Sequence, residues 1–314
     1  MATSLDVPAA GRRSTWISAR NLRIAAAFSL ALLWLVVTTG GLVRLTASGL
    51  GCPHWPTCDA NNSLLPADQS HALIEFSNRV ISGLAMLAAV GIALGARRLR
   101  GMDRVTTALV VAAAGTVAQV PLGAVTVAFD LNPFLVMSHF LLAMLVLTFA
   151  TWGTVQLWRE GREGAIADRR LGWLTWATVV AGLALVTSGT FVTAAGPHPG
   201  STSTPIQRIG NFYDATYIHV RAAVTFATLF LIVAVMLWRR MRGTLVQRLS
   251  LAGIVLTLCQ LGVGEYQYRN GLPWQVIAVH VGIAGTLVVT VVVVASMIAY
   301  GPPHRRRAEP PERV

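Results

Sequence analysis

Eight apolar segments, each long enough to cross a lipid bilayer, constrain this sequence more than any other feature. A transmembrane helix needs about 20 mostly apolar residues. Only 12% of the residues are charged, against about 25% in soluble domains. The sequence therefore predicts an all-α integral membrane protein with eight transmembrane helices, near 24–43, 71–95, 105–128, 134–157, 171–194, 216–238, 247–267 and 274–300.

The distribution of arginine predicts the orientation of these helices. The net charge is +12, and all 25 basic residues are arginine. Most of them lie before the first segment, after the last and in alternate connections, which places them on one side of the membrane. Basic residues accumulate on the cytoplasmic side. We therefore predict a multi-pass protein of a bacterial cell membrane with both termini in the cytoplasm, and the charge does not indicate a nucleic acid partner.

An internal repeat relates the two halves of the chain. A shift of 141 residues aligns Thr116 with Thr257, Gln119 with Gln260, Gly123 with Gly264, Leu131 with Leu272, His139 with His280 and Ala143 with Ala284, and it places Asn78 on His219. Four helices per half with the same topology predict two pseudo-symmetric four-helix bundles.

The repeat also sets the expected domain boundaries. Helix bundles build cofactor sites from side chains on facing helices, so each half is expected to hold one prosthetic group. The predicted parts are a cytoplasmic N-terminal segment (1–23), an N-terminal half (24–157), a cytoplasmic linker (158–170), a C-terminal half (171–300) and a cytoplasmic tail (301–314).

Three histidines lie inside predicted membrane segments at one depth. His139, His219 and His280 are each within about two turns of the outer end, or roughly 10 Å at 1.5 Å per residue. Polar side chains are costly in a membrane unless they are partnered. Two imidazoles on partner helices can bind opposite faces of one haem iron. We therefore predict His219 and His280 as axial ligands, with His139 as the corresponding ligand in the first half.

The first half has no evident second ligand. Asn78 occupies the position that matches His219, and asparagine is a poor iron ligand. A haem held by His139 alone has one open face, which suits a substrate better than an electron carrier. His71, two turns before Asn78 on the same helix face, is either a replacement ligand or an interfacial histidine at a helix start.

Charged residues in a membrane segment are candidates for function. Glu75 lies one helical turn from Arg79, so the two can form a structural ion pair. Alternatively, Glu75 accepts a proton or positions water beside a substrate, and Arg79 faces an anion such as a haem propionate. Arg221, two residues after His219, can play the same part in the second half.

Cys52 and Cys58 bracket the sequence CPHWPTC in the first external loop. Their spacing permits a disulfide-closed loop, and an oxidising location outside the cell membrane favours one. Free redox thiols that exchange electrons with a partner, or a metal site that includes His54, are the alternatives.

Four motifs together resemble the haem A synthase family. They are GGLVRLTASGLGCPHWPTC, IEFSNR, GAVTVAFDLNPFLVMSHFLLAM and VIAVHVGIAG, and they occur in the family's order across the membrane region. The resemblance implies an enzyme that oxidises the C8 methyl group of haem O to the formyl group of haem A for terminal oxidases. It also implies that His219 and His280 hold haem b in the C-terminal half, while the N-terminal half receives haem O.

The resemblance assigns further roles and partners. Glu75 matches the family's essential carboxylate, and Cys52 and Cys58 match its external cysteine pair. Many members have histidine at the position of Asn78, and some have a second cysteine pair where the connection 195–215 has none. The implied partners are haem O, a haem O synthase, a terminal oxidase assembly pathway, an electron acceptor and the lipid bilayer, and a homo-oligomer is left open.

The main alternative is a membrane dihaem cytochrome b that acts only in electron transfer. It explains the histidine pair equally well, but it explains Glu75 and the open first-half site less well, since electron carriers usually keep both axial ligands. A transporter is compatible with the repeat, but it does not require the matched histidines.

Overall fold

The computed structural model describes residues 18–52, 54–55, 57–58, 70–98, 102–159 and 168–298. In these ranges the chain forms eight helices and no strand, and all eight are long and apolar enough to cross a membrane. This confirms the predicted all-α membrane fold class. Most of the predicted N-terminal segment and linker, and all of the tail, lie outside the described residues. The helices are α1 (Ala19–Leu45), α2 (Ser70–Ala96), α3 (Asp103–Ala128), α4 (Pro133–Arg159), α5 (Arg169–Ala195), α6 (Phe212–Arg240), α7 (Leu245–Arg269) and α8 (Trp274–Ile298).

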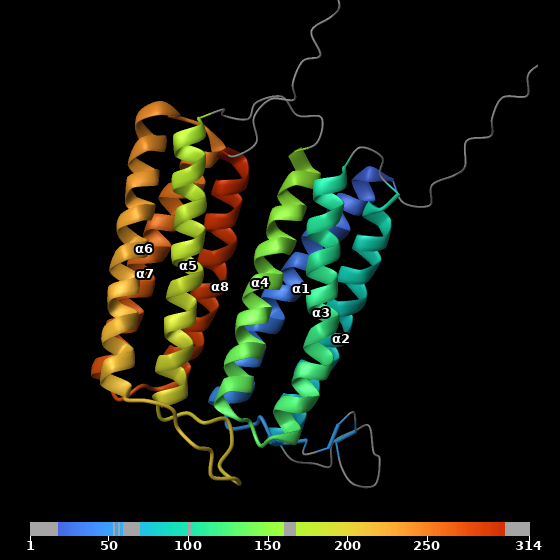
Figure 1. Ribbon diagram of the computed structural model, residues 1–314, viewed down its shortest axis with the longest axis vertical. Helices are drawn as coiled ribbons and strands as arrows, with labels where there is room; N and C mark the ends of the chain where they lie inside the picture. Colours follow the sequence, from blue (N-terminus) through green and yellow to red (C-terminus); the bar gives the residue numbers. More distant parts are fainter. Residues whose placement is uncertain are drawn as a thin grey trace, which may run out of the picture.

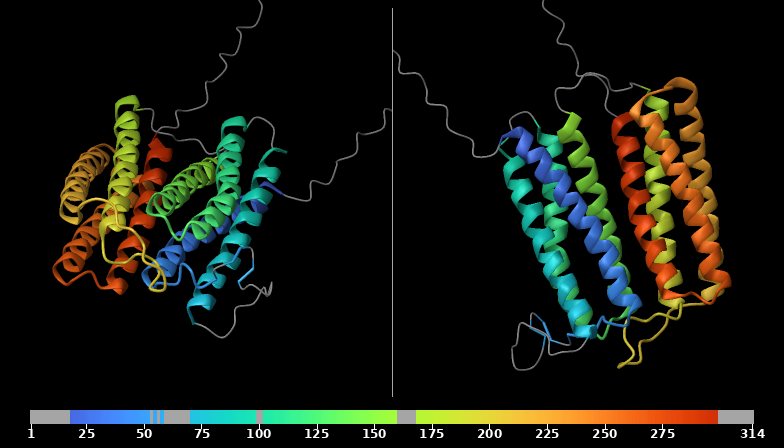
Figure 2. Two further views of the ribbon diagram at one scale, coloured as in Figure 1. Left: turned by 60° about the horizontal axis from the view of Figure 1, so that its bottom comes forward. Right: turned by 180° about the vertical axis from the view of Figure 1, so that it is seen from behind.

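The helices pack in two groups of four that follow the chain (Figure 1). Helices α1 to α4 contact their neighbours in sequence, and α1 also contacts α4. Helices α5 to α8 repeat this pattern, with α8 against α5. The groups meet through α1, α4, α5 and α8. Seen from behind, α1 runs obliquely across its group, with its C-terminal end toward the α5–α8 group (Figure 2).

Four connections gather at one end of the molecule, which we call the disulfide end. They are residues 46–58 as far as described, 129–132, 196–211 and 270–273. The described arginines of the other connections, such as Arg97 and Arg242, lie at the opposite end. Which side of the membrane each end faces stays a prediction from the arginine distribution.

The seam between the groups is closely packed, as the contact of α1 with α8 illustrates. A Cβ atom at Gly41 would lie 3.1 Å from Val281, and one at Gly285 would lie 3.3 Å from Trp34. The Trp34 Nε1–H donates to Thr286 Oγ1 at 3.1 Å. Small residues let membrane helices approach closely. The largest buried apolar cluster accordingly draws from both groups, with Leu33, Val37, Met144, Leu147, Phe230 and Val291 among its members.

The repeat extends to the backbone of the short connections. Leu131 and Leu272, which the repeat aligns, both have left-handed backbones with φ of 56° and 61°. The Leu131 N–H donates to Thr126 O at 2.9 Å, and the Leu272 N–H donates to Gln267 O at 2.8 Å. A branched side chain rarely adopts this conformation. Its recurrence shows that α3–α4 and α7–α8 are joined in the same way.

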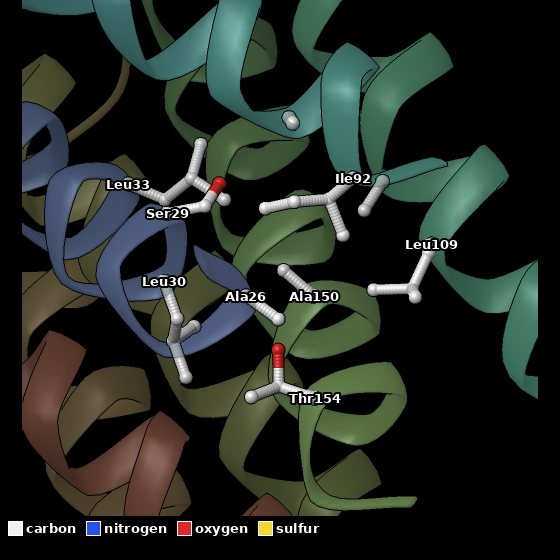
Figure 3. Close-up of a pocket in the computed structure, with 10 residues that line it drawn as sticks. Ala26, Ser29, Leu30, Leu33, Ile92, Leu109, Ala150 and Thr154 are labelled. Atoms are coloured by element: carbon white, nitrogen blue, oxygen red, sulfur yellow. The ribbon is translucent and has the colours of Figure 1, made fainter. Parts of the chain in front are cut away.

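A small cavity of about 10 Å³ lies among α1, α2, α3 and α4 (Figure 3). Its walls are alanine, leucine and isoleucine side chains and the hydroxyl-bearing Ser29 and Thr154. This volume holds about one water molecule at most. The cavity is therefore no candidate for a substrate site.

Candidate functional site

The intramembrane histidines lie at a common depth. His139, His219 and His280 are the seventh, eighth and seventh residues of α4, α6 and α8, and all three helices begin at the disulfide end. Each histidine is therefore about 10 Å from the start of its helix. Helices α4, α6 and α8 therefore carry the three imidazoles in one layer of the membrane region.

His219 and His280 meet across the interior of the second group. Their ring centroids are 6.5 Å apart and the ring planes are inclined by 58°. Helices α6 and α8 do not contact each other along their backbones, so only side chains bridge this space. Two imidazoles bound at about 2 Å to opposite sides of one metal ion have ring centres roughly 6 Å apart. The pair therefore has the spacing of two axial ligands.

The surroundings of this pair suit a haem. A Cβ atom at Gly189 would lie 3.0 Å from the His219 ring, and one at Gly264 would lie 3.4 Å from the His280 ring. His219 Nδ1 is hydrogen-bonded to Ser188 Oγ at 2.9 Å. No group of three or more metal-binding side chains occurs in the described ranges. A haem iron needs only two protein ligands, because the porphyrin supplies the other four.

The first group provides one imidazole where the second provides two. A Cβ atom at Gly123 would lie 3.5 Å from the His139 ring, which repeats the contact between Gly264 and His280. Asn78, at the position of His219, accepts a hydrogen bond at Oδ1 from Thr39 Oγ1 at 2.8 Å. His71 is exposed at the disulfide end, where its Nδ1 is hydrogen-bonded to Ser48 Oγ at 2.9 Å.

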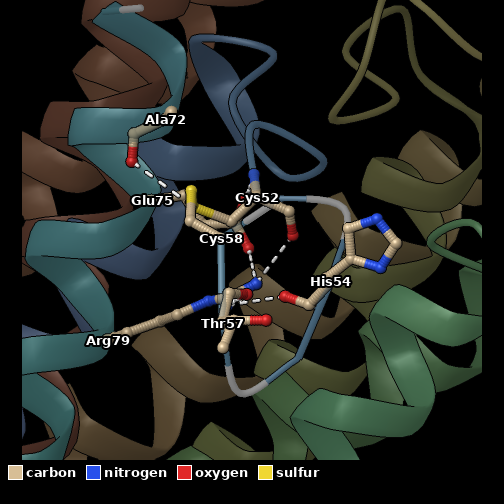
Figure 4. The surroundings of a disulfide bond; sticks show 7 residues. All are labelled: Cys52, His54, Thr57, Cys58, Ala72, Glu75 and Arg79. Atoms are coloured by element: carbon tan, nitrogen blue, oxygen red, sulfur yellow. Dashed lines mark hydrogen bonds and ion pairs between the residues drawn. A yellow bond between two sulfur atoms is a disulfide. The ribbon is translucent and has the colours of Figure 1, made fainter. Parts of the chain in front are cut away.

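Glu75 forms the ion pair that the helical spacing allows. Its side chain is buried, with 5% of the residue exposed. Oε1 accepts from Arg79 Nη2 at 2.5 Å, and Oε2 accepts from the Cys52 N–H at 2.8 Å. The carboxylate therefore joins α2 to the loop at the disulfide end (Figure 4).

Arg79 binds the same loop by its backbone. Its guanidinium donates to the carbonyl oxygens of Cys52, His54 and Thr57 at 2.9, 3.1 and 3.3 Å. The predicted disulfide between Cys52 and Cys58 is present and closes this loop. Arg79 is thus directed at the loop and at Glu75 (Figure 4), and this contact depends on tertiary structure that helical spacing does not reveal.

Comparison with known proteins identifies the family. A family model described as cytochrome oxidase assembly protein matches residues 23–292, which include all eight helices almost completely. The chain belongs to the cytochrome oxidase assembly protein family. The site described above therefore lies within the part of the chain that defines this family.

Two curated relatives of this family member are similar to it over most of its length. A haem A synthase of an Exiguobacterium species is 25% identical over 242 residues, 76% of this chain and 80% of that protein. A haem A synthase of Alkalihalophilus pseudofirmus is 25% identical over 286 residues, 86% and 94% of the two chains. A protohaem IX farnesyltransferase of Thermus thermophilus is 49% identical over 71 residues, but these are 21% of this chain and 11% of that protein.

Removing the Arg79 guanidinium from this family member should loosen the disulfide loop. Arg79→Gln leaves the buried carboxylate and two part-buried loop carbonyls with one donor fewer, and a buried polar group left unpaired costs about 1–3 kcal/mol. Since about 1.4 kcal/mol is a factor of ten, we expect dithiothreitol to reduce the Cys52–Cys58 bond at least tenfold faster, as measured by thiol alkylation. The control is Arg269→Gln, which removes an exposed partner of Glu265. Equal reduction rates in Arg79→Gln and the unmodified protein would contradict the role given to Arg79.

Three other arginines, Arg44, Arg208 and Arg221, lie at or near the disulfide end. Arg221 is exposed and stacks over Tyr217, with its guanidinium carbon 3.2 Å from the ring centroid. Arg44 and Arg208 both donate from Nη2 to Thr193 O, at 2.8 and 3.5 Å. The sequence assigned no role to Arg44 or Arg208, although both lie outside the segments in which most of the arginines gather.

Proposed function

We propose that this protein is a haem A synthase, a membrane oxidoreductase that converts haem O to haem A by oxidising the C8 methyl group to a formyl group. The observation that carries the proposal is an asymmetry between related halves. The second half has two imidazoles at axial-ligand spacing. The first has a single imidazole in the same layer, with a buried carboxylate on another helix of the same group. The whole-length similarity to haem A synthases supports the same reaction.

In the second half, His219 and His280 would hold haem b by their imidazole nitrogens. Haem b, when bound, supplies one-electron transfer. Ser188 fixes the orientation of the His219 ring through Nδ1, as residues beside metal ligands commonly do. Arg221, two residues beyond His219, is the proposed partner of a haem carboxylate in this half.

In the first half, His139 would bind the iron of haem O. Thr39 holds Asn78 by its side-chain oxygen, which leaves the opposite face of the substrate open, with His71 as the alternative ligand. Glu75 accepts the proton released from the methyl group during oxidation. Arg79 keeps this carboxylate next to the disulfide loop.

The same proposal covers the organisation of the chain. Residues 24–157 receive the substrate and 171–300 hold haem b, while 1–23, 158–170 and 301–314 lie in the cytoplasm. The proposal includes a haem O synthase as the enzyme that supplies the substrate. Terminal oxidase assembly consumes the product, and a separate acceptor takes the electrons.

The decisive experiment is expression in a host that makes haem O but not haem A. Haems are extracted from the purified protein and identified by chromatography and mass. Haem A or its alcohol intermediate establishes the proposed function. Haem B together with unchanged haem O, in folded protein supplied with an electron acceptor, establishes instead an electron-transferring cytochrome b.

A further inference from the structure

Helices α3 and α7 make the same pair of contacts with the histidines of α4 and α8. Gln119 Nε2 donates to His139 O at 3.1 Å, and Gln260 Nε2 donates to His280 O at 3.0 Å. One turn after each glutamine, a glycine lies against the imidazole ring of the same histidine, Gly123 in the first half and Gly264 in the second. The backbone and the ring of each histidine are thus held by the same helix.

At each of these contacts, two side-chain atoms lack a hydrogen-bond partner, and they are the equivalent atoms in both halves. Within the described ranges, Oε1 of Gln119 and Gln260 and Nδ1 of His139 and His280 are buried without a hydrogen bond. Leaving a buried polar atom unpaired costs about 1–3 kcal/mol. Such a pair of atoms, retained at repeat-related positions in two sites, indicates a function that a packing role does not explain. The glutamine Oε1 is an acceptor. The histidine Nδ1 becomes a donor once the other ring nitrogen, Nε2, binds a metal.

We propose that Gln119 and Gln260 are positioning residues for the haem-binding histidines, an inference that rests on the proposed function. The amide N–H fixes the height of the histidine backbone, and Oε1 accepts the Nδ1–H of the imidazole when haem is bound. A hydrogen bond to the second ring nitrogen raises the basicity of a metal-binding histidine. The two glutamines therefore set both the position and the electron donation of their ligands.

Because the repeat provides two equivalent glutamines, each can be changed separately, and the dissociation rate and midpoint potential of haem b are measured in each variant. Gln260→Met keeps the side-chain size but removes both hydrogen-bonding groups. Since changes to the groups that support a metal ligand weaken metal binding by about 10- to 100-fold, we expect haem b to dissociate at least tenfold faster. We also expect its midpoint potential to rise, because a less basic ligand destabilises the ferric state more. If the variant changes the ratio of the affinities for ferric and ferrous haem tenfold, the midpoint potential shifts by about 59 mV, because haem iron is a one-electron couple.

Two further variants separate positioning from folding. Gln260→Glu retains an acceptor oxygen and should keep the potential at or below that of the unmodified protein. Gln119→Met, the matched change in the first half, should leave the haem b potential unchanged and weaken retention of haem O. Equal shifts in Gln119→Met and Gln260→Met, or upward shifts in both Gln260 variants, overturn the proposal. An unmodified protein that binds no haem overturns the proposed function itself.

A second, independent observation concerns Arg44 and Arg208, two like charges that share one carbonyl oxygen. Neither takes part in an ion pair of the described residues, which are Glu75–Arg79, Asp168–Arg240 and Glu265–Arg269. The Nε–H of Arg44 is buried without a partner. The shared acceptor, Thr193 O, belongs to the last turn of α5, where a cation is favoured by the helix dipole. The helix dipole explains why one guanidinium lies at this carbonyl. It does not explain why a second guanidinium lies there, or why the Arg44 Nε–H has no partner.

The position of this pair indicates its ligand. Arg208 lines a cleft of about 310 Å³ together with Asn132, Pro133 and Phe134 at the start of α4. His139 is six residues beyond Pro133 on the same helix, or about 9 Å. A ligand that is held at His139 and extends about 9 Å toward the disulfide end would come level with this cleft along the helix axis. Guanidinium groups bind carboxylates through paired, charge-assisted hydrogen bonds.

We infer that Arg44 and Arg208 bind a propionate carboxylate of the substrate haem, which again rests on the proposed function. The test compares the dissociation constants of haem O and its dimethyl ester in neutral-lipid nanodiscs. The unmodified protein should bind the acid at least tenfold more tightly, and Arg44→Gln/Arg208→Gln should lose most of this preference. Arg269→Gln, which removes an exposed arginine at the same end of the molecule, is the control and should retain it.

Each outcome of this comparison has a definite meaning. An undiminished acid preference in the double variant overturns the inference and leaves the pair as a cap of α5. So does a preference in the unmodified protein that disappears when anionic lipid is added, because the site then holds a lipid phosphate. If the double variant does not fold, Arg208→Lys should give an intermediate preference. Failure of the unmodified protein to bind either haem refutes the proposed function instead.

Discussion

Replacing Glu75 with glutamine should stop the formation of haem A and its alcohol intermediate while bound haem remains. Glutamine has nearly the same size and still offers an oxygen to the Cys52 N–H, but it accepts no proton. Loss of a positioned proton acceptor typically lowers a rate by about 10²–10⁴-fold. The measurement is the haem content of Glu75→Gln, purified from the haem O-producing host and analysed by chromatography and mass.

Glu265→Gln is the matched control for this variant. Glu265 also pairs with an arginine four residues later, but its side chain is 59% exposed, and we expect full activity. The reduction rate of the Cys52–Cys58 bond separates two roles of Glu75. An unchanged rate together with lost haem A isolates the proton-accepting role, whereas undiminished haem A production would remove Glu75 from the mechanism.

Replacing either His219 or His280 with alanine should remove haem b from the protein. Each variant loses one of two axial ligands from a ring pair spaced at 6.5 Å, and an iron with one remaining protein ligand is held far less tightly. We expect haem b content to fall at least tenfold, as quantified from reduced-minus-oxidised spectra and pyridine haemochromes. Added imidazole should restore part of the spectrum, because it fits the space left by the missing ring.

Two controls assign this loss to the second half. His198→Ala removes a loop histidine that is hydrogen-bonded to Leu272 O, and it should leave the spectrum unchanged. His139→Ala should lower the retention of haem O but not of haem b. If His219→Ala and His280→Ala both keep the spectrum of haem held by two imidazoles, the proposed axial pair is wrong.

The fold class was predictable because length and apolarity determine whether a segment crosses a bilayer. The disulfide was predictable because Cys52 and Cys58 are close in sequence and lie in a connection outside the predicted helices. The common depth of His139, His219 and His280 followed from their distance to the segment ends. These features are local, so a linear reading of the chain reaches them.

The contacts of the arginines were not predictable in the same way. The i, i+4 spacing of Glu75 and Arg79 indicated an ion pair, but the fold of the loop decides that Arg79 also binds three carbonyls. Arg44 reaches a carbonyl 149 residues away in the other half. A repeat compares equivalent positions in the two halves, and it gives no information about contacts that join one half to the other. Gln119 and Gln260 make their contacts within one half. The repeat aligned these two residues, but only the structure shows their hydrogen bonds to His139 and His280.

The seam between the two groups of helices has the symmetry of a homodimer interface. Under the repeat, α1 corresponds to α5 and α4 to α8, so the contact of α1 with α8 and the contact of α5 with α4 are the same contact made twice. The contact of α4 with α8 pairs two helices that the repeat aligns. Such self-complementary contacts define an isologous interface. The two halves of the chain therefore meet as two copies of one subunit would, although they differ at the aligned positions Asn78 and His219.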